Sequence, residues 1–122
     1  MDGKKKRVLV IDDEKVIRDF LSSLLSLEEL EVVVVEDGHK ATELCRTNRF
    51  DLFFIDCRLP GLNGLETFRQ IRQIDPNAPA VMMTGYTVED ILEQAQLEGA
   101  RASIRKPFNI NEIKELVNKI LI

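Results

Sequence analysis

The stretch Val-Leu-Val-Ile-Asp-Asp at residues 8–13 places four consecutive apolar residues directly before two aspartates. A short apolar run without polar alternation is typical of a strand that is covered on both faces, which favours a parallel sheet. Further runs of this kind follow along the chain, at residues 32–35, 52–55, 80–83 and, in a shorter form, 102–104. The sequence therefore predicts a sheet of five strands.

Amphipathic segments alternate with these apolar runs. Their spacing predicts helices at residues 15–27, 40–47, 64–74, 88–97 and 111–121. In the first and last of them, apolar side chains recur once per turn, as a helix packed on a sheet requires. Five strand–helix units joined by right-handed crossovers form a doubly wound α/β domain. We therefore expect one domain over residues 1–122 and no second domain.

Composition limits the functions open to the chain. Its 122 residues are 44% hydrophobic and 31% charged, with a net charge of −4. This balance indicates a globular protein and gives no basic face for nucleic acid. No apolar segment has the length of a membrane span or the features of a signal peptide, and the two cysteines suggest no disulfide framework. We expect a cytoplasmic protein that binds neither nucleic acid nor membrane.

Chemically active residues follow four of the five predicted strands. Asp12 and Asp13 follow the first, Asp56 the third, Thr84 the fourth, and Lys106 lies shortly after the fifth. Taken singly, each has an ordinary explanation as a helix cap, a loop residue or a solvated lysine. In parallel α/β sheets, however, ligands bind outside the carboxyl ends of the strands. The shared edge therefore predicts one site built from all of these residues.

Three carboxylates at one edge repel one another, so they either raise each other's pKa or bind a cation. Oxygen ligands favour Mg²⁺, with Mn²⁺ as the alternative. A cation among acids, opposite an ammonium and a hydroxyl, suits phosphoryl transfer, because both positive groups offset charge on the phosphoryl oxygens. An aspartate can then act as the nucleophile and hold the phosphoryl group as an acyl phosphate.

Four short sequence motifs contain these residues and together resemble those of a known protein family. They are Val-Ile-Asp-Asp-Glu at 10–14, Phe-Ile-Asp at 54–56 with Leu-Pro-Gly-Leu-Asn-Gly at 59–64, Met-Thr-Gly-Tyr at 83–86, and Lys-Pro-Phe at 106–108. With them the chain resembles, over essentially its whole length, a response-regulator receiver domain of two-component signalling. The resemblance implies a flavodoxin-like (βα)5 sheet of order 2-1-3-4-5. It also implies a phosphorylation-dependent switch and not an enzyme acting on a separate substrate.

The resemblance assigns roles to the acidic residues. Asp56 is the implied phosphoacceptor, taking a phosphoryl group from a phosphohistidine of a histidine kinase or phosphotransfer protein. Asp13 and Asp56 are implied to ligate Mg²⁺ directly, and Asp12 through water. The backbone carbonyl of Arg58 completes the implied protein ligands.

The same resemblance implies how the switch works. Thr84 and Lys106 would hold the phosphoryl oxygens, and the bond from Lys106 to Pro107 would be cis. Movement of Thr84 would alter the surface of the fourth helix, fifth strand and fifth helix, which in related domains binds an output partner or a second copy. Ser103 is a departure, because receivers usually carry Tyr or Phe there.

Arg58 and Tyr86 lie two residues after Asp56 and Thr84, and we hypothesise that they slow hydrolysis of the acyl phosphate.

Three rival functions fit less well. An aspartyl-nucleophile phosphatase needs a second acid where Arg58 stands, and a flavin mononucleotide carrier needs hydroxyls and glycine where the acids at 12–14 stand. A pseudo-receiver would lack a key residue, and none is missing.

Overall fold

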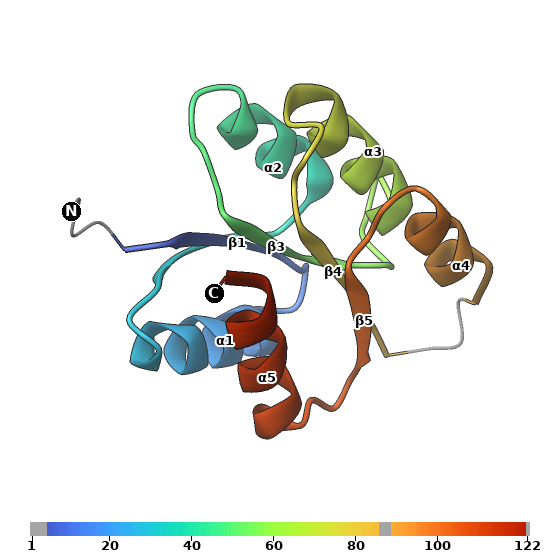
Figure 1. The fold of residues 1–122 in the computed structure, drawn as a ribbon. Coiled ribbons are helices and arrows are strands. Elements are labelled where there is room, and N and C mark those ends of the chain that lie inside the picture. The colour runs from blue at the N-terminus through green and yellow to red at the C-terminus, as the bar shows by residue number, and fades with distance from the viewer. Residues whose placement is uncertain (1–4, 86–88, 122) are drawn as a thin grey trace.

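The computed structural model describes residues 5–85 and 89–121. In these residues five strands form one parallel sheet of order β2-β1-β3-β4-β5, and five helices connect or follow them (Figure 1). Along the chain the elements are β1 (Arg7–Ile11), α1 (Lys15–Leu27), β2 (Glu31–Val35), α2 (Gly38–Cys45), β3 (Leu52–Asp56), α3 (Gly64–Ile74), β4 (Ala80–Thr84), α4 (Glu89–Leu97), β5 (Ala102–Arg105) and α5 (Ile110–Leu121). The predicted doubly wound α/β fold and its strand order are confirmed.

Helices cover both faces of the sheet. Figure 1 shows α1 and α5 on one face and α2, α3 and α4 on the other. Successive side chains of a strand point to opposite faces, so β1 contributes to two separate cores. Val8 and Val10 pack with α1 and α5, whereas Leu9 and Ile11 pack with the helices of the other face. This double coverage explains why the strand sequences lack polar alternation.

The edge strand β2 departs from the predicted pattern. β1, β3 and β4 are buried almost throughout, but Glu31 and Val34 of β2 are exposed. The strand pairs only with β1, so one of its edges has no neighbouring strand and the helices cover it incompletely. An apolar run such as 32–35 therefore does not prove that both faces are covered.

Helix ends follow local capping. α1 and α3 have the predicted bounds, whereas α2 begins two residues earlier than predicted. The side chain of Asp37 accepts a hydrogen bond from the backbone N–H of Lys40, so α2 starts at Gly38 and not at residue 40. α5 begins one residue early, where Asn109 accepts backbone hydrogen bonds. The predicted start of the fourth helix, residue 88, lies outside the described residues.

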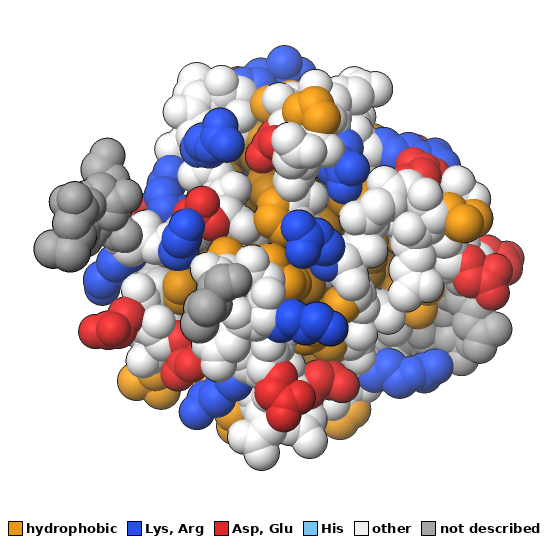
Figure 2. All heavy atoms as spheres, viewed as in Figure 1, with side chains coloured by type: hydrophobic (Ala, Val, Ile, Leu, Met, Phe, Trp, Pro, Cys, Tyr) orange, Lys and Arg blue, Asp and Glu red, His pale blue; other side chains and the backbone are white. Residues whose placement is uncertain are grey.

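Charged side chains of both signs are interspersed over the face seen in Figure 2, and hydrophobic side chains show mainly between them near its middle. Neither sign forms a continuous patch on this face. Among the residues that the structure describes, no helix combines the length and apolar character needed to cross a bilayer.

Candidate functional site

The register of β1 and β3 brings two aspartates together. Ile11 pairs with Ile55, so Asp12 and Asp56 lie next to each other at the carboxyl edge of the sheet. Both are buried, while Asp13 is exposed. One carboxylate oxygen from each of the three lies within 4.8 Å of the others. Three oxygen donors so close together fit a divalent cation such as Mg²⁺.

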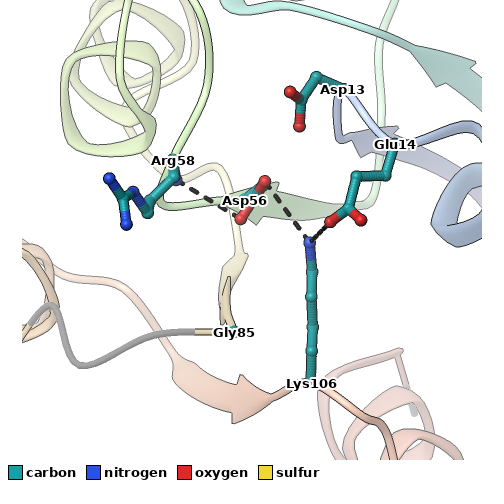
Figure 3. A pocket seen from close by; sticks show the side chains of 6 residues that line it. All are labelled: Asp13, Glu14, Asp56, Arg58, Gly85 and Lys106. Atoms are coloured by element: carbon teal, nitrogen blue, oxygen red, sulfur yellow. Dashed lines mark hydrogen bonds and ion pairs between the residues drawn. The ribbon is translucent and has the colours of Figure 1, made fainter.

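Lys106 reaches the same point from the end of β5. Its backbone N–H donates a hydrogen bond to the carbonyl oxygen of Thr84, 2.7 Å away, which ties the ends of β4 and β5 together. Figure 3 shows the side chain rising toward Asp56 and Glu14. Its Nζ lies 2.7 Å from Asp12 Oδ2, 3.1 Å from Glu14 Oε1 and 3.5 Å from Asp56 Oδ2. The lysine is thus an integral part of the acidic site.

Burial and crowding shift the ionisation of these groups. Burial, together with the charge of Asp12, raises the pKa of Asp56 to about 6. Burial likewise raises the pKa of Asp12, against the opposing hydrogen bond from Lys106. For Lys106, burial lowers the pKa, but the hydrogen bond to Asp12 and the charge of Asp56 outweigh it and raise the pKa above its usual value. At neutral pH the site therefore holds an ammonium and a mostly ionised Asp56.

The turn after β1 is held by backbone and side-chain contacts. Glu14, not Asp12 or Asp13, is the N-cap of α1, so the capping alternative for the two aspartates is wrong. Asp12 Oδ1 instead accepts the backbone N–H of Glu14 at 2.8 Å, and Arg18 Nη1 donates to the carbonyl oxygen of Asp12 at 2.9 Å. Sequence patterns alone assign no role to Glu14 or Arg18. An acid directly after the aspartate pair was the one available signal for Glu14.

The start of α3 packs against the end of β3. A Cβ atom added to Gly64 would lie 2.3 Å from the carbonyl oxygen of Asp56, so only glycine allows this approach. The backbone N–H of Gly64 donates to the carbonyl oxygen of Cys57 at 3.1 Å. Arg58 donates its backbone N–H to Asp56 Oδ1 at 3.4 Å, while its side chain extends away from that carboxylate in Figure 3. These contacts fix the backbone that carries Asp56.

The other predicted residues that the structure describes lie at this edge or on β5. Thr84 ends β4 and is buried, and the bond from Lys106 to Pro107 is cis, as expected. Ser103 is exposed on β5, and Tyr86 lies outside the described residues. A pocket of about 370 Å³ opens over the acids and the ammonium. Its lining residues are Asp13, Glu14, Asp56, Arg58, Gly85 and Lys106.

Comparison with known proteins places this geometry in a family. The model of the response regulator receiver domain matches residues 8–118. The chain is 30% identical over 116 residues to sporulation initiation phosphotransferase F of Bacillus subtilis, covering 95% of this chain and 94% of that protein. Other relatives are longer, and the chain spans about half of their length, 47% and 51% in two cases.

Solved structures agree with this assignment. A receiver domain from Methanospirillum hungatei superimposes with a TM-score of 0.91 at 27% identity, covering 95% of this chain and 93% of that one. A response regulator from Burkholderia pseudomallei superimposes with a TM-score of 0.83 at 27% identity, covering 93% of this chain and 65% of that one. Its structure contains a phosphorylated aspartic acid, a calcium ion and citrate.

The fold, the acidic triad at the carboxyl edge of the sheet and the family match agree with one another. The chain belongs to the response regulator receiver domains, the phosphorylation-dependent switches of two-component signalling.

Proposed function

We propose that the chain accepts a phosphoryl group from a phosphohistidine of a histidine kinase or phosphotransfer protein onto Asp56. The observation that carries this proposal is the position of the Asp56 carboxylate. It is almost fully buried, belongs to the acidic triad and has the Lys106 ammonium 3.5 Å away. A carboxylate placed in this way can attack phosphorus while the ammonium offsets the charge on the phosphoryl oxygens.

The transfer step is a substitution at phosphorus. An oxygen of Asp56 forms the new P–O bond as the P–N bond to the donor imidazole breaks, and the imidazole nitrogen keeps the electron pair. Lys106 and the hydroxyl of Thr84 then hold phosphoryl oxygens in the product. Each chain itself takes up one phosphoryl group. We therefore regard it as a phosphoacceptor that assists its own phosphorylation and slow dephosphorylation, and not as an enzyme.

The acidic triad is the proposed metal site. Asp13 and Asp56 would ligate Mg²⁺ directly, Asp12 through water, and the backbone carbonyl of Arg58 would add one more oxygen; Mn²⁺ is the alternative. The cation supplies charge neutralisation for the phosphoryl oxygens when it is bound. The donor chemistry of the triad supports this assignment. The calcium ion and phosphorylated aspartic acid in the Burkholderia relative support it further.

The output of the switch is proposed to be the surface of α4, β5 and α5. A phosphoryl group adds negative charge and acceptor oxygens, which draw Thr84 and Lys106 inward. The segment after Thr84 leads into α4, so its movement would reshape that surface for an output partner or a second copy. Ser103 cannot supply the usual aromatic signal, so we assign the signal to this segment.

Several expectations stay part of the proposal. Arg58 and Tyr86 are proposed to slow loss of the phosphoryl group. The single-domain organisation over residues 1–122 and the cytoplasmic location are proposed as well, the latter supported by two free, buried cysteines.

Acetyl phosphate tests the phosphoacceptor assignment directly. The protein is incubated with acetyl phosphate and Mg²⁺, and its intact mass is recorded beside that of Asp56→Asn. Gain of one phosphoryl group by the wild type alone is the expected result. Gain by both proteins would show that another residue is the nucleophile, and gain by neither would contradict phosphorylation by a small donor.

A further inference from the structure

Among the described residues, three carboxylates pair with the Lys106 ammonium, and they are not equivalent. Asp12 and Asp56 belong to the triad that fits a metal ion. Glu14 is outside the triad, yet its Oε1 lies only 3.1 Å from Nζ. Metal binding and phosphoryl transfer account for the contacts of Lys106 with Asp12 and Asp56, but they do not account for its contact with Glu14.

Glu14 approaches the lysine from the solvent side. Its side chain is 60% exposed, whereas Asp12 is fully buried. Its backbone is fixed, because it is the N-cap of α1 and its N–H donates to Asp12 Oδ1. In Figure 3 the carboxylate points across the pocket to the end of the Lys106 side chain. The contact therefore spans the opening through which a phosphoryl donor would enter.

Mg²⁺ and the phosphoryl group would compete for the contacts that Lys106 makes with its carboxylate partners. Asp56 would ligate Mg²⁺ directly and Asp12 through water, so the cation and the Lys106 ammonium compete for these two carboxylates. A phosphoryl group on Asp56 would in turn compete with Glu14 for the ammonium. Glu14 is the one carboxylate among the three partners that metal binding would leave to Lys106.

We propose that Glu14 is a positioning residue that retains the Lys106 ammonium at the rim of the site, from which the incoming phosphoryl group has to withdraw it. This inference rests on the proposed function. It has two consequences of opposite direction. Without Glu14, Lys106 holds Asp12 and Asp56 more tightly, so Mg²⁺ binds more weakly. At saturating Mg²⁺ the cation competes successfully with Lys106 for Asp12 and Asp56. Without Glu14 the ammonium is then available to the incoming phosphoryl group, so phosphorylation is faster.

Glu14→Gln tests both consequences, with Glu36→Gln as its matched control. Glu36 is also an exposed acid at the carboxyl edge of the sheet, directly after β2, but its partner is Lys40. Both variants remove one negative charge. For Glu14→Gln we expect about two- to fivefold weaker Mg²⁺ binding by calorimetry. Its phosphorylation by acetyl phosphate at saturating Mg²⁺ should be about two- to fivefold faster by intact mass. Glu36→Gln should stay close to the wild type in both measurements.

A second pair of variants shows whether Glu14 acts through Lys106. In a Lys106→Gln background, Glu14→Gln should no longer accelerate phosphorylation, because the group that it releases is absent. Equal acceleration in both backgrounds would overturn the inference, and so would equal effects of Glu14→Gln and Glu36→Gln. These outcomes are distinct from failure of the proposed function, in which the wild type itself would gain no phosphoryl group.

Discussion

At the residue scale, the fold brings several carboxylates together at the site and places the Lys106 ammonium among them. Asp56 illustrates the cost, because burial and the neighbouring Asp12 raise its pKa to about 6. A carboxyl group whose pKa is raised on folding binds its proton more tightly in the folded state. The stability that this group contributes is therefore fully present below its ordinary pKa of 3.8, and it is lost as pH rises from there through the raised pKa of about 6.

Asp56→Asn should consequently stabilise the protein in the absence of divalent cations. At pH 7 we expect a gain of about 1–3 kcal/mol in the free energy of unfolding, because the amide lacks the charge that burial and Asp12 disfavour. At about pH 4.5, where folded Asp56 is protonated, the gain should fall below half of that value. Urea unfolding in a chelating buffer at the two pH values measures it. A gain that does not depend on pH would contradict the electrostatic cause.

Residue identities could be predicted here more readily than residue contacts. Asp12, Asp56 and Lys106 were found because each follows a strand, and parallel strands end at one edge. The contact between Glu14 and Lys106 could not be found in this way, because it depends on the directions of the two side chains and not only on the edge at which they start. The sequence pattern predicts which residues lie at the edge of the sheet, but not which carboxylate oxygens pair with the lysine ammonium.

At the element scale, the start of α3 is tied to the backbone of the site. Asn63 accepts the backbone N–H of Glu66, and the side chain of Glu66 accepts the backbone N–H of Asn63, which makes a complete capping box. The next residue, Gly64, packs directly on the backbone of Asp56. The predicted bounds of α3 are confirmed, and Asn63 with Glu66 three residues later is the sequence pattern typical of such a helix start.

Asn63→Ala should lower the free energy of unfolding by about 1 kcal/mol. The backbone N–H of Glu66 loses its acceptor, the Asn63 side chain, and the reciprocal hydrogen bond from the backbone N–H of residue 63 to the Glu66 side chain is weakened. Chemical denaturation followed by circular dichroism measures the change. Asn118→Ala is the matched control, since Asn118 is an exposed residue inside α5, where alanine favours a helix. Equal midpoints for Asn63→Ala and the wild type would show that the capping box adds nothing to stability.

α2 shows where element prediction failed. The predicted helix begins at residue 40, whereas in the structure Asp37 caps the helix and Gly38 is its first residue. Gly38 has no room for a side chain, because an added Cβ would lie 2.1 Å from Thr67 Oγ1 of α3. The glycine is thus explained by the packing of α2 on α3, a tertiary contact that local sequence does not reveal.

At the scale of the whole molecule, the alternation of strands and helices predicted the fold class but not the order of the strands. Right-handed crossovers leave several orders open, and the order 2-1-3-4-5 followed from the family resemblance. That order has a chemical consequence. It sets β1 beside β3, which brings Asp12 to Asp56, and β5 beside β4, which brings Lys106 to Thr84. The site is therefore a property of the complete sheet and of no single element.

Because the site exists only in the folded sheet, Mg²⁺ should stabilise the whole protein. Binding to the folded state alone adds about 2.7 kcal/mol to the free energy of unfolding at a hundredfold excess over the dissociation constant, or roughly 5–10 °C in the thermal midpoint. Calorimetric melting with and without MgCl₂ measures it. NaCl at equal ionic strength should have a smaller effect, because it only screens the carboxylates. Asp56→Asn should lose most of the Mg²⁺ response, since it removes one ligand and the charge that attracts the ion. An equal rise with both salts, or an undiminished response in Asp56→Asn, would contradict a metal site in the triad.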